Sequence, residues 1–155
     1  MSTFSYHDGE LLAEQVRLTE IAQTYGTPAY VYSQGAIESA YRQFDQAFEA
    51  QPHMVCYSVK ANSNIAILAL LARLGSGFDI VSGGELQRVL RAGGSADRIV
   101  FSGVGKARWE LEMALQAGIS CFNVESSAEL FLLEEIAREL GTVAPISIRV
   151  NPDVD

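Results

Sequence analysis

Short apolar runs recur at nearly equal spacing from Val55 onward. They begin near Val55, Phe78, Ile99, Cys121 and Ile146, which are 23, 21, 22 and 25 residues apart. Each run contains β-branched or aromatic residues and is short enough to be a strand. The pattern predicts five strands, each separated from the next by enough chain for one helix.

The segments between these runs carry apolar residues at helical spacing. In the first segment Ile65, Leu68 and Leu71 share one face, as a period of 3.6 residues requires. The other three segments have equivalent apolar faces: Leu86, Val89 and Leu90; Leu111, Ala114 and Leu115; and Leu130, Leu133, Ala137 and Leu140. The four predicted helices end at Gly75, Gly93, Gly118 and Gly141. Strands and helices that alternate in this way predict βα units on a parallel sheet.

Five such repeats fit either a doubly wound sheet or part of a (β/α)8 barrel. The first strand is not followed by a Gly-x-Gly-x-x-Gly sequence, which weakens the dinucleotide-binding version of the doubly wound sheet. The equal spacing favours the α/β barrel of the TIM type. A complete barrel needs eight strands and about 250 residues, so we expect only about the first five strands of a longer protein here.

Polar residues stand where the predicted strands leave the sheet. They are Lys60, Asp79, Ser82, Ser102, Asn123, Glu125, Arg149 and Asn151. In a barrel the carboxyl ends of the strands meet on one face, where active sites are built. This convergence favours an enzyme, although polar residues also mark the point where any strand leaves a core.

The segment before Val55 follows a different pattern. Leu18, Ile21 and Tyr25 lie on one face of a predicted helix that Gly26 ends. Residues 29–32 then predict a lone strand, followed by Ser33 as the cap of a second helix. This strand has no hairpin partner nearby, so we expect it to pair with sequence elsewhere.

Composition excludes several classes of function. The chain has 11 Lys and Arg against 19 Asp and Glu, a formal net charge of -8, which opposes a general affinity for nucleic acid or anionic membrane. No apolar run approaches the roughly 20 residues of a membrane helix, and the polar N-terminus is not a signal peptide. Cys56 and Cys121 lie in apolar runs and are expected to be small core residues of a reduced, cytoplasmic protein. The two histidines and the carboxylates form no metal-ligand motif.

Lys60 is the first candidate for chemistry, because it ends an apolar run just before a helix. Burial in a low-dielectric setting would lower the pKa of its amine and free it as a nucleophile for Schiff-base chemistry. A lysine at a strand end can also extend its ammonium to water, and position alone favours that structural interpretation.

Asp79 lies inside an apolar run, where an unpaired carboxylate is costly, so we expect it to have a specific partner. Ser82 with Glu85, and Ser126 with Glu129, match the Ser-x-x-Glu capping box of a helix start. Structure alone accounts for these four residues, so they are not catalytic candidates.

Three motifs together resemble the pyridoxal-phosphate-dependent decarboxylases with an alanine-racemase-like barrel. They are YSVKAN at 57–62, GFDIVSGGEL at 77–86 and RVNPD at 149–153. The resemblance runs from about Thr27 to the C-terminus. Within the group, SGGEL and RVNPD are most similar to the diaminopimelate decarboxylases.

The resemblance implies pyridoxal 5'-phosphate as cofactor, held by Lys60 as a Schiff base, with Asp79 and Arg149 close to it. It implies an enzyme that converts meso-2,6-diaminopimelate to L-lysine and CO2, with an amino-acid substrate and a homodimeric full-length protein. The phosphate loop and the substrate-binding residues would lie beyond Asp155, so the chain alone is expected to be inactive.

The resemblance also implies a division of the chain. Residues 1–33 would hold a helix and a strand that join a second, β-rich domain, and residues 34–155 would form the first half of the cofactor-binding barrel. Three alternatives stay open: a non-catalytic barrel that carries pyridoxal phosphate, a decarboxylase of another basic amino acid, and a half-barrel that serves as a scaffold.

Overall fold

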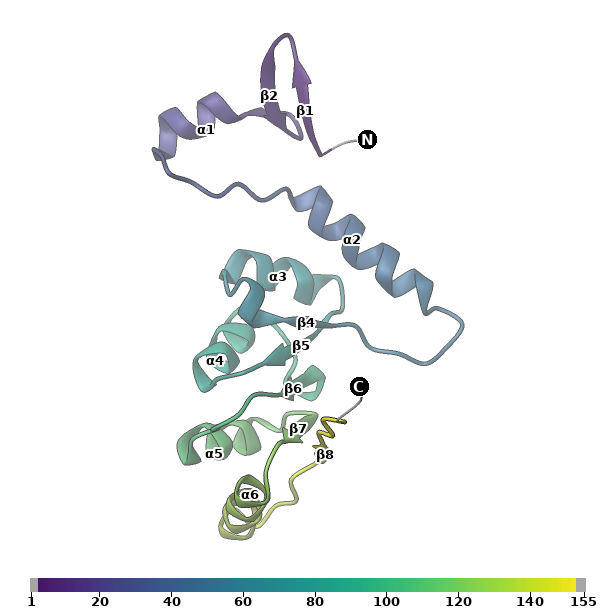
Figure 1. Cartoon of the computed structure of the whole chain (residues 1–155), viewed down its shortest axis with the longest axis vertical. Helices are drawn as coiled ribbons and strands as arrows, with labels where there is room; N and C mark the ends of the chain where they lie inside the picture. The colour runs from purple at the N-terminus through teal and green to yellow at the C-terminus, as the bar shows by residue number, and fades with distance from the viewer. Residues whose placement is uncertain (1–2, 153–155) are drawn as a thin grey trace. The chain divides into compact units, whose positions relative to one another are not determined.

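The five predicted strands form one parallel sheet in a computed structural model that describes residues 3–152 (Figure 1). The order of the strands in the sheet is their order in the sequence, β4-β5-β6-β7-β8. Their bounds are Cys56–Ser58 for β4, Gly77–Ile80 for β5, Ile99–Phe101 for β6, Cys121–Val124 for β7 and Ile146–Ile148 for β8. Each strand begins within one residue of its predicted start, and the strand order is that of the first five units of a (β/α)8 barrel.

One α-helix connects each strand to the next, as parallel pairing requires. In Figure 1 the four connecting helices lie along one side of the sheet. They are α3 (Ile65–Arg73), α4 (Gly83–Arg91), α5 (Arg108–Ala117) and α6 (Ser127–Glu139); two short 3-10 helices, η1 (Val59–Ala61) and η2 (Ala96–Arg98), lie after β4 and before β6. The predicted helices are therefore confirmed.

The core lies between this sheet and its helices. Phe78, Phe101 and Phe122 occupy neighbouring strands and have no exposed surface, and Leu86 of α4 is buried with them. Burying one side chain of this size contributes roughly 1.5–3 kcal/mol. Because side chains alternate along a strand, the residues next to each phenylalanine in its strand face the opposite side of the sheet. That side carries the polar residues.

The N-terminal part of the chain contains three strands that the sequence analysis missed. They are β1 (Phe4–His7), β2 (Glu10–Ala13) and β3 (Val16–Arg17), paired antiparallel in the order β1-β2-β3. Asp8 and Gly9 connect the first two with φ angles of 50° and 81°, the left-handed conformation of a tight hairpin turn. Asp-Gly between two short runs was the signal that could have revealed the hairpin.

The expected strand at residues 29–32 is not formed within the described residues, and its pairing with sequence elsewhere stays a prediction. These residues have no regular secondary structure, and Tyr30 and Tyr32 are 90% and 58% exposed. A strand needs a neighbour to pair its backbone groups, and none of the described residues supplies one. The two helices on either side are confirmed: α1 spans Leu18–Tyr25 and α2 spans Gln34–Ala47.

The start of α2 is held from two directions. Ser33 Oγ accepts a hydrogen bond from the Ala36 amide at 3.0 Å, as predicted for a cap, and donates one to Glu14 Oε1 at 2.6 Å. Glu14 Oε1 also accepts from the Gly35 amide at 2.8 Å, and these donors lower the pKa of the Glu14 carboxyl. The turn before β3 is thereby tied to the helix.

The chain separates into two compact units, one that ends at His53 and one that begins at Met54. The predicted division at residues 33 and 34 stays a prediction. Asp153, the last residue of the RVNPD motif, lies outside the described residues. No helix between residues 3 and 152 is long and apolar enough to cross a membrane.

Candidate active site

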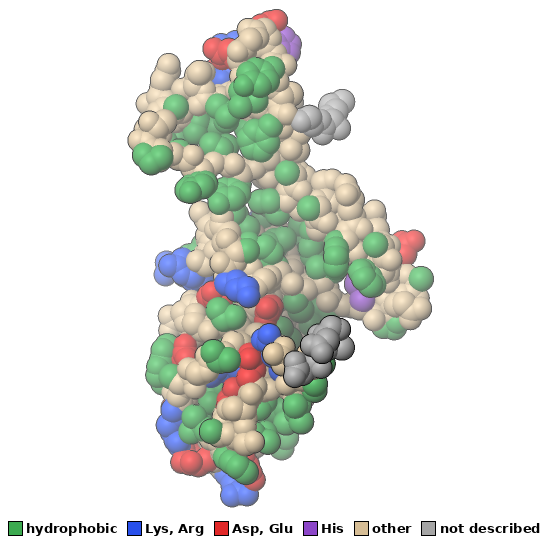
Figure 2. Space-filling view, viewed as in Figure 1, with side chains coloured by type: hydrophobic (Ala, Val, Ile, Leu, Met, Phe, Trp, Pro, Cys, Tyr) green, Lys and Arg blue, Asp and Glu red, His purple; other side chains and the backbone are tan. Residues whose placement is uncertain are grey.

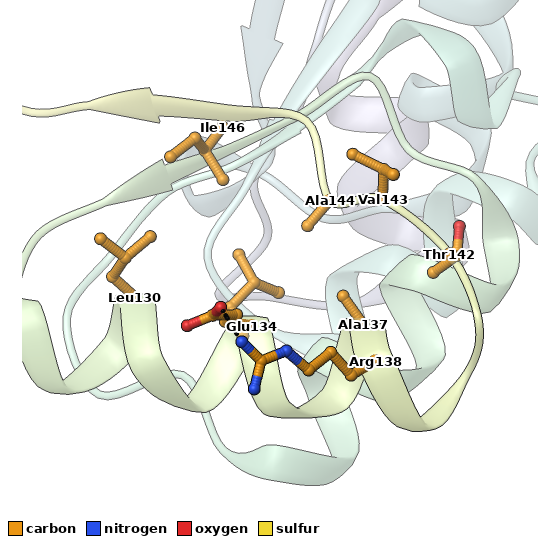
Figure 3. Close-up of a pocket in the computed structure, with 9 residues that line it drawn as sticks. Leu130, Glu134, Ala137, Arg138, Thr142, Val143, Ala144 and Ile146 are labelled. Carbon is orange, nitrogen blue, oxygen red and sulfur yellow. Dashed lines mark hydrogen bonds and ion pairs between the residues drawn. The ribbon is translucent and has the colours of Figure 1, made fainter.

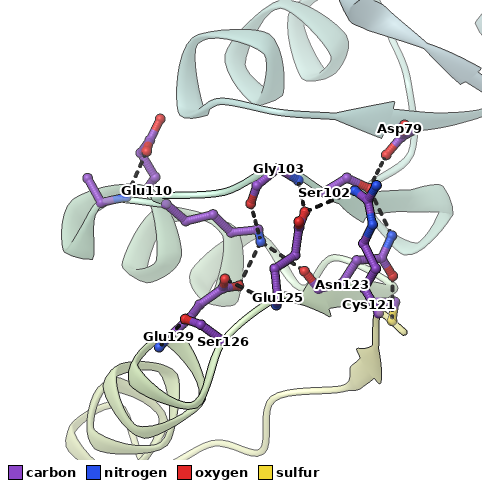
Figure 4. A network of polar contacts seen from close by, with 12 residues as sticks. Asp79, Ser102, Gly103, Glu110, Cys121, Asn123, Glu125, Ser126 and Glu129 are labelled. Carbon is purple, nitrogen blue, oxygen red and sulfur yellow. Dashed lines mark hydrogen bonds and ion pairs between the residues drawn. The ribbon is translucent and has the colours of Figure 1, made fainter. Parts of the chain in front are cut away.

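Polar side chains at the carboxyl ends of four neighbouring strands, β4 to β7, form a hydrogen-bonded row, of which Figure 4 shows Asp79, Ser102 and Asn123. Asn123 Nδ2 donates to Ser102 Oγ at 2.8 Å, and Ser102 Oγ donates to Asp79 Oδ1 at 2.5 Å. On the other side Ser58 Oγ donates to Asp79 Oδ2 at 3.5 Å. The expected partner of Asp79 is therefore present, and both carboxylate oxygens are occupied by hydroxyl donors.

Lys60 lies in η1, directly after β4 and two residues beyond Ser58. Its side chain is exposed, and its amine has no hydrogen bond or ion pair with any residue from 3 to 152. The described residues therefore do not bury the Lys60 amine in the low-dielectric setting that we considered. The amine is accessible at the carboxyl end of β4, beside the strand that carries Asp79.

Arg149 follows β8 and forms a strand-end ion pair. Its Nη1 lies 3.3 Å from Glu125 Oε1, and its side chain is 57% exposed. Glu125 Oε1 also accepts a hydrogen bond from the Gly103 amide at 2.9 Å. Gly103 has a φ of 95°, which favours glycine at this point of the loop. Glu125 therefore connects the loop after β6 to the end of β8.

Lys106 has an environment opposite to that of Lys60. The two are the only lysines in the sequence. The Lys106 side chain is 1% exposed, and its Nζ donates to Gly103 O at 2.8 Å, Asn123 O at 2.9 Å and Glu129 Oε1 at 2.6 Å. Its ammonium also lies 5.6 Å from the centre of the Phe101 ring. All three of its hydrogens are thus used within the fold.

The sequence analysis missed the Lys106–Glu129 pair. Glu129 was assigned only to a helix cap, and that cap is present, since Ser126 Oγ accepts from the Glu129 amide at 3.2 Å. At the start of α4 the Glu85 amide likewise donates to Ser82 Oγ at 3.2 Å. In both helices the serine half of the predicted capping box is present, whereas the glutamate carboxylate accepts from the amide before the serine, that of Val81 or Glu125. Nothing in the spacing of residues 106 and 129 reveals the ion pair, because the two are brought together only by β7 pairing with β6.

Backbone amides at the carboxyl ends of the strands are largely taken by glutamate side chains. Glu85 Oε2 accepts from the Val81 amide at 2.7 Å, and Glu110 Oε1 accepts from the Gly83 amide at 2.7 Å. A phosphate group binds to helix N-termini through amides that have no other acceptor. The loops after β5 and β6 are therefore poorly suited to hold a phosphate.

The two cysteines are half-buried rather than fully buried, and both are free thiols. Burial raises the pKa of the Cys56 thiol, and the Asp79 carboxylate adds to the effect; burial also raises the pKa of Cys121. A raised pKa reduces the thiolate needed for nucleophilic attack. Across the described residues, no group of His, Cys, Asp and Glu is arranged to hold a metal ion.

A separate apolar cleft of about 300 Å³ lies between α6 and the segment that leads into β8 (Figure 3). It is lined mainly by α6, with Leu130 and Ala137 facing Val143 and Ile146 across it, and Glu134 and Arg138 paired at 2.6 Å. None of the candidate site residues lines it. The cleft is therefore distinct from the polar row.

Comparison with known proteins gives a consistent result. The family model described as pyridoxal-dependent decarboxylase, pyridoxal binding domain, matches residues 34–155. Diaminopimelate decarboxylase of Pseudomonas fluorescens is 62% identical over 100% of the chain, and that of Vibrio cholerae is 58% identical over 100% of it. The chain spans 38% and 37% of the lengths of these two relatives.

Solved structures show the same similarity. Diaminopimelate decarboxylase from M. jannaschii in complex with L-lysine has a TM-score of 0.95 and 39% identity, over 99% of this chain and 37% of that one. Lysine/ornithine decarboxylase from Vibrio vulnificus has a TM-score of 0.75 at 20% identity, over 86% of this chain and 35% of that one. The second similarity concerns the fold alone.

Proposed function

The chain belongs to the pyridoxal-dependent decarboxylases, and from this premise we propose that its parent protein binds pyridoxal 5'-phosphate through Lys60 and decarboxylates meso-2,6-diaminopimelate. The substrate would lose one carboxyl group as CO2 and gain a proton in its place, giving L-lysine. Relatives named diaminopimelate decarboxylase at 62% and 58% identity support this substrate, as does a similar structure solved with L-lysine.

The observation that carries the assignment of Lys60 is the contrast between the two lysines. A lysine that attaches a carbonyl cofactor needs an amine that can leave its protein partners and lose a proton. Lys106 is committed to an ion pair and two carbonyl oxygens, with its side chain 1% exposed. Lys60 is exposed at the end of β4. Of the two, Lys60 is the lysine that can react.

The described residues fit part of a pyridoxal phosphate site. Lys60 supplies the amine, Asp79 supplies a carboxylate whose orientation is fixed by Ser102, and Arg149 supplies a cation at the end of β8. When bound, the cofactor provides an electron sink for the charge left as CO2 departs. Lys60 would then return a proton from its Nζ. Because nearby amides already bind glutamates, the phosphate contacts would come from sequence outside this chain.

We also infer that the parent protein is a cytoplasmic homodimer. Support for the compartment comes from two half-buried free thiols, which persist in reducing surroundings. Support for association comes from hydrophobic side chains at the surface of the N-terminal unit, some of which Figure 2 shows. Tyr25, for example, is 81% exposed. Sedimentation of the full-length protein would give the number of subunits.

The direct test is to locate the cofactor chemically in the parent protein. Borohydride reduction in the presence of pyridoxal phosphate, followed by peptide mapping, should place the pyridoxyl group on Lys60. Lys60→Arg should abolish release of CO2 from meso-diaminopimelate, because a guanidinium does not form the required bond. Compared without pyridoxal phosphate, Lys60→Arg and the parent should melt at nearly the same temperature, since the side chain is exposed and a bound cofactor would itself stabilise the parent.

Arg88→Lys is a useful control, because it places a further exposed lysine on α4 and leaves the residues of the polar row unchanged. It should remain unlabelled at position 88. A pyridoxyl group found on Lys106 would refute the assignment of Lys60. Cofactor uptake without CO2 release from diaminopimelate would instead favour a non-catalytic barrel or a different amino-acid substrate.

A further inference from the structure

We propose that Lys106 and Glu129 are a buried positioning pair that fixes the Glu125 carboxylate, and through it Arg149, at the carboxyl end of the sheet. The inference rests on the proposed function, since Arg149 matters there only if a cofactor binds beside it. Neither residue of the pair touches the cofactor in this proposal. Their role is to hold the loop after β6 and the loop after β7 in one arrangement.

The first step is the way Lys106 joins three separate elements. Its Nζ binds Gly103 O in the loop after β6, Asn123 O on β7, and Glu129 Oε1 in the first turn of α6, at 2.8, 2.9 and 2.6 Å. The Lys106 and Glu129 side chains are 1% and 7% exposed. A charge-assisted contact that is shielded from water restricts geometry more strongly than a surface ion pair does.

The second step leads from this pair to Glu125. Glu129 Oε2 accepts from the Glu125 amide at 3.4 Å, which places the backbone of Glu125. The Gly103 amide donates to Glu125 Oε1 at 2.9 Å, which places its carboxylate. Lys106 holds the carbonyl of the same Gly103. Both ends of Glu125 are therefore set by residues that the pair controls, as Figure 4 shows.

The third step leads from Glu125 to Arg149. Arg149 Nη1 lies 3.3 Å from Glu125 Oε1. The Glu125 side chain is 13% exposed, whereas the Arg149 side chain is 57% exposed. The more buried carboxylate thus restrains the more exposed guanidinium. Without the pair, the carbonyl of Gly103 would lose the Lys106 ammonium and the loop that orients the Glu125 carboxylate would be held less firmly. Arg149 would then sample more conformations.

The test uses the parent protein with Lys106→Met and Glu129→Gln combined. The double variant avoids an unpaired buried charge, so it should fold where Lys106→Met alone could fail, and glutamine keeps an acceptor for the Glu125 amide. We expect the Gly103 amide to exchange hydrogen about tenfold faster, as expected when one hydrogen-bonded support is lost. The Gly83 amide, which binds Glu110, should keep its protection and serves as the internal reference.

A second measurement links the pair to Arg149. The double variant should bind pyridoxal phosphate about tenfold more weakly, the effect of losing one well-placed contact. In an Arg149→Ala background the same double variant should cause almost no further loss, because the pair acts through Arg149. Arg108→Met is the matched control: it removes a cation of α5 that pairs with Glu112, Glu135 and Glu139 of the exposed surface. It should leave cofactor affinity unchanged.

Retained protection of the Gly103 amide would overturn the proposal. An equal loss of cofactor affinity in both backgrounds would also overturn it, since the pair would then be purely structural. A parent protein that takes up no pyridoxal phosphate would refute the proposed function instead. The exchange measurement would still decide whether the pair places Glu125.

Discussion

The carboxylate of Asp79 lies in a largely buried strand, where its hydrogen bonds offset the free-energy cost of burying a charge. Both of its carboxylate oxygens accept hydrogen bonds, from Ser102 Oγ at 2.5 Å and Ser58 Oγ at 3.5 Å. We expect Asp79→Ala to weaken pyridoxal phosphate binding by at least about tenfold while lowering stability by about 1–3 kcal/mol, the cost of leaving the hydroxyl donors unpaired. Spectroscopic titration with the cofactor and thermal unfolding measure the two effects separately.

Two companion variants distinguish a site role from a structural one. Ser102→Ala leaves the Asp79 carboxylate in place but removes its shortest hydrogen bond, so it should weaken cofactor binding less than Asp79→Ala does. Arg149→Ala should act in the same direction as Asp79→Ala and less severely. If Asp79→Ala bound the cofactor normally and only melted earlier, Asp79 would be a structural residue.

The individual residues show where sequence reasoning is reliable and where it stops. The partner of Asp79 could be predicted in kind, because an unpaired carboxylate within an apolar strand is costly. Its identity could not, since Ser58 and Ser102 come from two other strands. The exposure of Lys60 was one of two interpretations that the sequence left open, and the burial of Lys106 was not predicted. Each depends on which segments pack around the lysine rather than on the residues next to it in sequence.

His53 is a pH-sensitive contact at the end of the N-terminal unit. Its Nδ1 lies 2.8 Å from Gln51 O and its Nε2 lies 3.0 Å from Asp45 Oδ1, so both ring nitrogens face acceptors. The Gln51 carbonyl, followed by the Asp45 carboxylate, raises the pKa of His53 above its ordinary 6.5. The protonated ring, which donates from both nitrogens, is the form that binds the end of α2 to the following segment.

The sign of the pH effect follows from the raised pKa. The contact should contribute fully to stability below about pH 6.5, the value in the unfolded chain. The contribution should disappear as the pH rises through the higher folded pKa. An NMR titration of the imidazole should give a pKa above 6.5, and Asp45→Asn should lower it. A pKa at or below 6.5 in the parent would contradict this interpretation.

Among the elements, the strands of the sheet and all four of its connecting helices were predictable, and the N-terminal strands were not. The hydrophobic period is strong from Val55 onward because each strand is covered by a helix. Strand β1 is exposed along its whole length, so it has no buried face for an apolar pattern to mark. Residues 29–32 have a strand-like composition but no neighbour among the described residues, so the strand expected there stays a prediction.

The barrel-like order of the second unit was predictable from equal spacing, but the tight coupling between its loops was not. Glutamates 85, 110, 125 and 129 each accept a hydrogen bond from a backbone amide at the carboxyl ends of the strands. This arrangement stabilises the loops and occupies amides that a phosphate would otherwise use. It is consistent with our proposal that the phosphate contacts of the parent protein come from sequence outside this chain.

The 155-residue chain by itself should release no CO2 from meso-diaminopimelate. Within the described residues, β4 and β8 each pair on one side only, and open edges of this kind associate with other chains. The apolar residues of the last segment are exposed, with Ile148 at 69% and Val150 at 75%. We therefore expect the isolated chain to self-associate and to bind pyridoxal phosphate weakly and reversibly. Sedimentation and a CO2-release assay test both expectations. A monomer that decarboxylates diaminopimelate would show that residues 1–155 already contain a complete site.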